Sequence, residues 1–175
     1  MLQINVSQQL KEPIGSTRDY EVNEVVDMAG GDSQVQGKVR LVRTDRAILV
    51  QGMLQTEVRL TCSRCLSLCS CPLTLNIEEE YFPKTDILSG APVPVPEESG
   101  GFTIDKHHIL DLVVAIRQQA ALVTPMKPLC REDCAGLCPS CGHNLNQGAC
   151  GCPPSEADQR WAALRKLAVT SSNDV

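Results

Sequence analysis

The ten cysteines constrain this chain most, because they fall into two clusters and occur nowhere else. Cysteines that served only as small buried side chains would be scattered along the 175 residues. Clustered thiols in a chain without a recognisable export signal favour metal binding or redox chemistry over a disulfide framework. The clusters comprise Cys62, Cys65, Cys69 and Cys71, and then Cys130, Cys134, Cys138, Cys141, Cys150 and Cys152.

The run Cys138-Pro-Ser-Cys141-Gly142 predicts a zinc knuckle, a tight turn that directs two thiolates at one ion. A structural zinc ion takes four ligands in a tetrahedron, and Cys150 and Cys152 supply a second pair nearby. The residues between the pairs are turn-rich and poor in apolar side chains, so they need an ion to become ordered. We therefore predict that these four cysteines bind zinc.

The run Cys62-Ser-Arg-Cys65 closes a predicted strand and supplies half of a second site. Its natural complement is the pair Cys130 and Cys134, which would complete four thiolates and clip the sheet to the C-terminal segment. A competing arrangement joins Cys134 to the Cys-Pro-Ser-Cys knuckle and leaves the other thiols free. The chain is thus expected to bind one or two Zn²⁺ ions, and two cysteines of the first cluster, Cys69 and Cys71, receive no role.

Apolar and polar residues alternate over 34–43, 48–62 and 73–81, as in strands with one buried face. Short links between these strands favour an antiparallel meander. Gly52 predicts a bulge or bend in the second strand. A briefer alternation at residues 2–6 indicates one more short strand.

Helical spacing of apolar residues begins at Ile109 and continues to Ala120, with Thr103 or Asp105 as the expected N-cap. A last helix is expected to open at Pro153-Pro154 and to place Trp161 on its apolar side. The predicted fold class is α+β, with an antiparallel β-meander sheet packed with helices, a Cys-rich zinc-knuckle segment and a C-terminal helix. The expected units are a sheet domain at 1–122, with a flexible Pro-rich loop at 88–101, and a zinc-binding segment with the C-terminal helix at 123–175.

The sequence motifs give little support for an enzymatic function. A thioredoxin-like redox pair would sit at the N-terminus of a helix after a strand, and neither CxxC opens an amphipathic helix. A zinc deaminase needs His-x-Glu, which is absent from the sequence. Four cysteines also close a zinc ion to substrate, whereas a catalytic zinc keeps one position open. We therefore expect no enzymatic activity.

The formal net charge of −5 argues against a protein that coats nucleic acid by charge alone. A basic stretch could still touch phosphate, although an ordinary solvated sheet face is the favoured explanation. No apolar run approaches the roughly 18 residues of a membrane helix. Because the chain also has no recognisable export signal, we expect it in the cytoplasm. The basic stretch that could touch phosphate consists of Lys38, Arg40, Arg43, Arg46, Arg59 and Arg64.

Long motifs around both clusters resemble the YceD family, the large ribosomal RNA subunit accumulation proteins. They are Leu60-Thr-Cys-Ser-Arg-Cys-Leu66, the run 125–146, and Cys150-Gly-Cys152 with the tail 158–167. The resemblance implies a bacterial or plastid-type protein needed for accumulation or processing of large-subunit ribosomal RNA. Our own hypothesis for the molecular step is a zinc-stabilised assembly factor that docks on the pre-ribosomal large subunit or a ribosomal protein. The alternative is a redox-switched zinc chaperone, a holdase activated by oxidation, or a thiol-redox protein.

Overall fold

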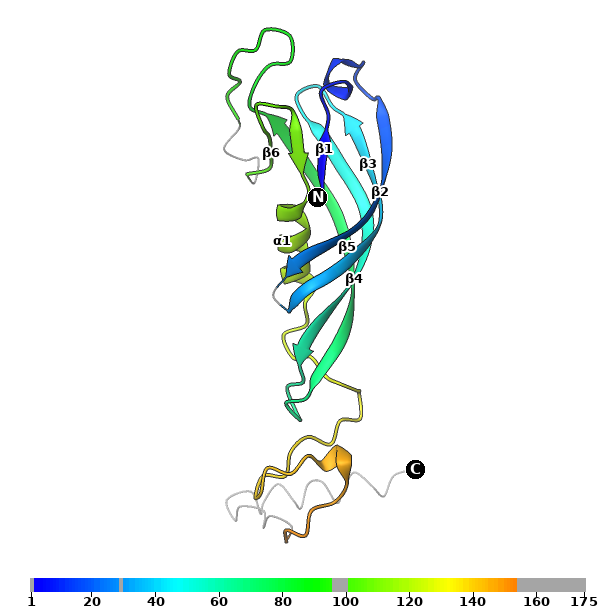
Figure 1. Cartoon of the computed structure of the whole chain (residues 1–175), viewed down its shortest axis with the longest axis vertical. Helices are drawn as coiled ribbons and strands as arrows, with labels where there is room; N and C mark the ends of the chain where they lie inside the picture. Colours follow the sequence, from blue (N-terminus) through cyan, green and yellow to red (C-terminus); the bar gives the residue numbers. More distant parts are fainter. Residues whose placement is uncertain (1, 29, 96–100, 154–175) are drawn as a thin grey trace, which may run out of the picture.

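The computed structural model describes residues 2–28, 30–95 and 101–153, and its main feature is a long curled sheet (Figure 1). The order of the seven strands is β1-β7-β6-β5-β4-β3-β2. The strands are β1 (Gln3–Asn5), β2 (Thr17–Met28), β3 (Gly31–Arg43), β4 (Ile48–Thr61), β5 (Leu68–Pro83), β6 (Thr103–Ile104) and β7 (Ile109–Asp111). The helical elements are α1 (Val113–Val123) and two 3₁₀ turns, η1 (Gln9–Lys11) and η2 (Leu145–Gln147).

The long strands β2 to β5 pair antiparallel in chain order, as the alternating pattern of β3, β4 and β5 predicts. Strand β2 was not expected, although Val22, Val26 and Met28 share its buried face. The exposed Glu24 interrupts that face and hides the alternation from a reading of the sequence. A charged side chain at this position also protects the edge of the sheet from pairing with another chain.

The whole sheet is mixed, so the predicted antiparallel meander is not confirmed as its overall topology. Strand β6 pairs in parallel with the end of β5, joining Phe82 to Thr103 and Pro83 to Ile104. Strands β6, β7 and β1 then extend this edge through antiparallel pairs. The difference arises because the chain leaves β5, crosses the Pro-rich loop and returns alongside the same strand end.

Gly52 marks no bulge, which was one of the two features predicted there. It pairs with Val39 on one side and with Ile77 on the other, in an uninterrupted register. A Cβ atom there would lie 2.5 Å from the carbonyl oxygen of Lys38. The glycine therefore serves the close approach of β3 to β4.

The α-helix begins at Val113, later than the apolar spacing suggested, because residues 109–111 form β7. The proposed N-caps are wrong: Thr103 lies in β6, and the Asp105 carboxylate accepts backbone N–H bonds in the turn before β7. In the described part of the chain α1 is the one α-helix, so a sheet packed with several helices is not confirmed. The predicted C-terminal helix, including Trp161, lies outside the described residues.

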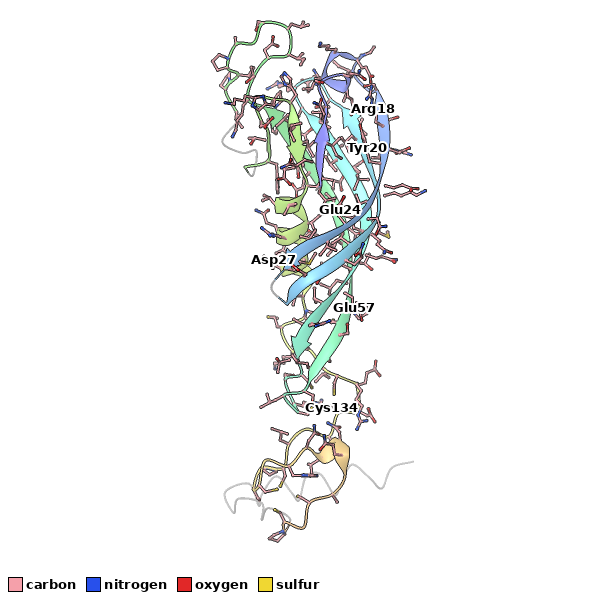
Figure 2. The ribbon with its side chains drawn as sticks, viewed as in Figure 1. Arg18, Tyr20, Glu24, Asp27, Glu57 and Cys134 are labelled. Atoms are coloured by element: carbon pink, nitrogen blue, oxygen red, sulfur yellow. The ribbon has the colours of Figure 1, made fainter. Side chains whose placement is uncertain are left out.

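The core lies between α1 and the inner face of the sheet (Figure 1). Helix α1 contributes Ala115, Ile116 and Ala120, while the centre of the sheet contributes Leu54 and Leu75. The larger of these side chains, Ile116, Leu54 and Leu75, each stabilise the fold by about 1.5–3 kcal/mol on burial. Figure 2 shows Cys134 at the tip of the sheet, where β4 and β5 meet, and Arg18 near the other end of the sheet; the rest of the cysteine-rich segment extends beyond the tip. The cysteine-rich segment therefore projects from the sheet.

Candidate metal centres

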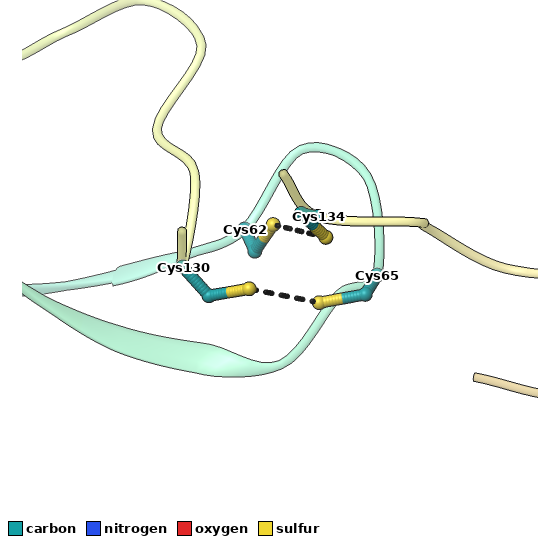
Figure 3. A group of neighbouring side chains, drawn as sticks. All are labelled: Cys62, Cys65, Cys130 and Cys134. Carbon is teal, nitrogen blue, oxygen red and sulfur yellow. Dashed lines mark hydrogen bonds between the residues drawn. The ribbon is translucent and has the colours of Figure 1, made fainter. Parts of the chain in front are cut away.

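The first four-cysteine group joins the tip of the sheet to the segment that follows α1. Cys62 and Cys65 lie in the turn from β4 to β5, and Cys130 and Cys134 approach from the later segment (Figure 3). The Sγ atoms of Cys62 and Cys134 are 3.8 Å apart, and those of Cys65 and Cys130 are 3.6 Å apart. Four sulfurs around a tetrahedral zinc with bonds of about 2.3 Å would be separated by about 3.8 Å. The group thus has the dimensions of a zinc site.

The second group consists of Cys138, Cys141, Cys150 and Cys152, whose Sγ atoms all lie within 4.8 Å of one another. Cys134 belongs to the first group, so the structure does not bring it to the Cys-Pro-Ser-Cys knuckle as the competing arrangement required. The eight cysteines singled out from the sequence therefore form two separate sets of four.

The two CxxC runs form the same turn. The Leu66 N–H donates to the carbonyl oxygen of Cys62 at 3.0 Å, and the Gly142 N–H donates to that of Cys138 at 2.9 Å. The residue after each pair has a left-handed φ angle, 59° at Leu66 and 73° at Gly142. These turns point backbone N–H groups at the first sulfur of each pair.

That hydrogen bonding favours the thiolate form. The backbone N–H of Cys65, assisted by that of Arg64, lowers the pKa of the Cys62 thiol to about 6. The backbone N–H groups of Cys141 and Ser140 lower the pKa of Cys138 to about 6. Each group therefore contains one thiol poised to ionise near neutral pH.

Other thiols of the same groups are held protonated when no cation is near. Desolvation and the neighbouring Cys65 sulfur raise the pKa of Cys130 to about 12. The Cys141 sulfur and desolvation raise the pKa of Cys152 to about 12. Four close thiolates repel one another, and a divalent cation is the species that lets all of them ionise.

Two asparagines connect the groups. The Asn146 amide nitrogen donates to the Cys134 sulfur at 3.3 Å, while its oxygen accepts from the Ala135 N–H at 2.9 Å. The Asn144 amide donates to the Ser67 hydroxyl in the β4–β5 turn at 3.3 Å. Sequence reasoning missed these roles, because an asparagine in a turn-rich loop usually serves the turn itself.

Cys69 and Cys71 belong to neither set of four. Cys69 is half-buried against the first group, where its thiol contacts the Leu60 carbonyl oxygen at 3.4 Å. Burial raises the pKa of the Cys69 thiol, with a further contribution from the neighbouring sulfurs. Cys71 packs against the main core of the sheet.

The basic residues do not gather into one positive face. Lys38 pairs with Glu21 at 3.2 Å, and Arg40 pairs with Asp19 at 2.7 Å, both across the β2–β3 ladder. Acidic partners on the neighbouring strand therefore offset the charge on the sheet.

The other basic side chains are dispersed. At one end of the sheet Arg43 donates to the carbonyl oxygens of Thr44 and Ala47, and Arg46 pairs with its neighbour Asp45. At the other end Arg64 donates to the Cys134 carbonyl oxygen at 3.0 Å. Arg59 lies near the end of β4. This arrangement weakens the case for RNA contact through a basic sheet face.

A curled sheet joined to two compact four-thiol groups defines a β-rich protein with two candidate tetrathiolate centres. The family model of the large ribosomal RNA subunit accumulation protein YceD matches residues 50–168, and the chain belongs to this family. None of the helices among the described residues is long and apolar enough to cross a membrane.

Similar proteins come from bacteria and a plant. An uncharacterized protein of Mycobacterium tuberculosis is 31% identical over 132 residues, which covers 74% of this chain and 59% of that protein. A second, from Mycobacterium leprae, is 28% identical over 130 residues, with coverages of 74% and 57%. The chloroplastic large ribosomal RNA subunit accumulation protein YCED homolog 1 of Arabidopsis thaliana is 26% identical over 155 residues, with coverages of 76% and 48%. The chain spans less than two thirds of each of these relatives, and no solved structure matches it.

Proposed function

We propose that this chain is a zinc-stabilised, non-enzymatic factor that promotes accumulation of large-subunit ribosomal RNA. It acts by docking on the pre-ribosomal large subunit or on a ribosomal protein. The observation that carries the proposal is the pair of four-cysteine groups within the segment that matches the family. The relative from Arabidopsis supports the link to ribosomal RNA through its name.

A structural role for the metal follows from the donor sets. Four thiolates fill the tetrahedron around each ion and leave no position for water or substrate. Sulfur separations of 3.6 Å and 3.8 Å suit ligands of one ion, whereas a disulfide would need about 2.05 Å. In this proposal each ion fixes the local fold, and the docking surface comes from the protein around it.

The proposed location is the bacterial cytoplasm. Thiols remain reduced in that compartment, so eight ligand cysteines stay available for metal. Direct contact with RNA is not needed for the proposal, since the paired residues Lys38 and Arg40 face acidic neighbours.

The test uses cells that lack the chromosomal copy and carry a tagged plasmid copy. We expect loss of the protein to lower the ratio of large-subunit to small-subunit ribosomal RNA, and the tagged protein to sediment with large-subunit precursors. Cys134→Ser should fail to restore the ratio, because it removes one ligand of the first group. The matched control Cys71→Ser should restore it, since Cys71 lies outside both groups.

Normal ribosomal RNA in the deletion strain, with no ribosomal component bound to the tagged protein, would contradict the proposal. Holdase activity that arises only after peroxide treatment, together with zinc release, would favour the redox-switched chaperone instead.

A further inference from the structure

The first four-cysteine group contains one thiol that is much more accessible than the other three. Cys130 is exposed, whereas Cys62, Cys65 and Cys134 are 0%, 4% and 3% exposed. The three buried thiols form a compact cluster of their own at the tip of the sheet. Because the protein around a metal site controls the access of solvent to its ligands, Cys130 is the member of this group most open to replacement.

A fifth thiol lies against the three buried ones. Cys69 packs on their cluster and is half-buried there. Its place follows from the β4–β5 ladder, in which Cys69 pairs with Leu60, two residues before Cys62. Cys69 and the three buried thiols therefore amount to a set of four that does not include Cys130.

The neighbouring Cys71 provides a comparison within the same strand. Cys69 and Cys71 lie two residues apart on one face of β5. Cys71 packs against the main core of the sheet, as an ordinary small apolar residue does. Cys69 packs against candidate metal ligands instead. Filling of the core therefore accounts for Cys71 and does not account for Cys69.

The Cys69 thiol is held in its present position by a weak contact. It donates to the Leu60 carbonyl oxygen at 3.4 Å, and a thiol is a poor hydrogen-bond donor. Rotation about the single Cα–Cβ bond moves the sulfur among staggered positions and leaves the backbone in place. A change from this contact to a bond with an ion in the buried cluster therefore needs no rearrangement of the sheet.

We propose that Cys69 and Cys130 are alternative fourth ligands of the first zinc site. The ion stays bound to Cys62, Cys65 and Cys134, while the fourth position passes from one thiol to the other. The incoming thiol gives its proton to solvent as it binds, and the departing thiolate takes one up. Because Cys134 remains a ligand throughout, the cysteine-rich segment stays attached to the sheet. The exchange rests on the proposed zinc sites and extends the first of them by one thiol.

The second group supplies a matched comparison. Cys141 is exposed there, as Cys130 is in the first group. All ten cysteines lie in the described part of the chain, and the two outside the sets of four pack elsewhere, Cys69 on the first group and Cys71 on the core. The second group thus has no spare thiol. We expect Cys130→Ser to keep two zinc ions per chain and Cys141→Ser to keep one.

The experiment counts zinc by native mass spectrometry of the reduced, full-length chain after dialysis against a weak chelator. We expect two ions in the unsubstituted chain, in Cys69→Ser and in Cys130→Ser, and one in the double variant Cys69→Ser/Cys130→Ser. The control Cys71→Ser/Cys130→Ser should keep two. In a second measurement Co²⁺ replaces zinc, and the absorption of the thiolate–cobalt bonds should be the same in Cys130→Ser as in the unsubstituted chain.

One zinc ion in Cys130→Ser, with two in the unsubstituted chain, would overturn the exchange and leave the proposed zinc sites standing. A weaker cobalt absorption in Cys130→Ser would do the same. So would two ions in the double variant, because a fourth ligand other than Cys69 would then complete the site. An unsubstituted chain without two zinc ions would overturn the zinc sites and the exchange together.

Discussion

Outside the cysteines, the side chain of Asn146 contacts a candidate metal ligand directly. Its amide donates to the Cys134 sulfur and accepts from the backbone of Ala135, so it orients a ligand. Loss of such an outer partner typically lowers metal affinity about 10–100-fold. We expect Asn146→Ala to show this loss in a chelator competition assay, with Gln147→Ala as the control. Equal affinities for Asn146→Ala and the unsubstituted protein would refute the assigned role.

The left-handed residues that follow the two CxxC pairs, Leu66 and Gly142, lead to a prediction about backbone strain. Gly142→Ala should lower the free energy of unfolding by about 1 kcal/mol, because φ is 73° and nothing lies within 4 Å of the added Cβ. Leu66→Gly should not lower it, since glycine adopts φ 59° without strain. Chemical unfolding of both variants with metal present gives the comparison. A marked loss of stability in Leu66→Gly would show that the leucine serves packing.

Among single residues, the candidate ligand cysteines could be predicted from the sequence. The hydrogen bonds and ion pairs between residues far apart in the chain could not. CxxC spacing and the natural complement of Cys62 and Cys65 follow from ligand chemistry, and the structure groups the same residues. The bond from Asn144 to Ser67 joins residues 77 positions apart, which no local pattern reveals. The pairing of Lys38 with Glu21 was also hidden, because it depends on the unexpected strand β2.

Among the strands, the close approach of β3 to β4 at Gly52 leaves no room for a side chain on the glycine. A methyl group at this position would meet the Lys38 carbonyl oxygen at 2.5 Å and the Val39 side chain at 2.7 Å. We expect Gly52→Ala to destabilise the protein by roughly 1–3 kcal/mol in chemical denaturation, as overpacking does. The exposed neighbour Gln51, changed to Ala, should cost less than about 0.5 kcal/mol. Equal stabilities of the two variants would contradict the predicted crowding.

The long strands β3, β4 and β5 were predictable because apolar and polar residues alternate over many positions in each of them. Strand β4 buries Ile48, Val50, Leu54 and Val58 on one face, as its even-numbered pattern indicates. Strands β6 and β7 have two and three residues and depend on long-range pairing, so periodicity cannot find them. The same short strands displaced the start of α1 from Ile109 to Val113.

For the whole molecule, the sheet and the cysteine-rich segment should respond differently to metal removal. The sheet has its own aliphatic core, whereas residues 130–152 bury few side chains other than cysteines. We expect chelation under reducing conditions to abolish protection from amide hydrogen exchange in residues 130–152, while β3 to β5 stay protected. Unchanged protection of residues 130–152 after complete chelation would mean that no ion orders this segment.

We propose that each four-cysteine group holds its own zinc ion. Elemental analysis combined with native mass spectrometry of the reduced, full-length chain counts the ions directly. Two closed groups predict two zinc ions per chain, and a single ion in each of the variants Cys65→Ser and Cys141→Ser. A reduced native chain that carries no stoichiometric zinc, or only one ion, would contradict the claim.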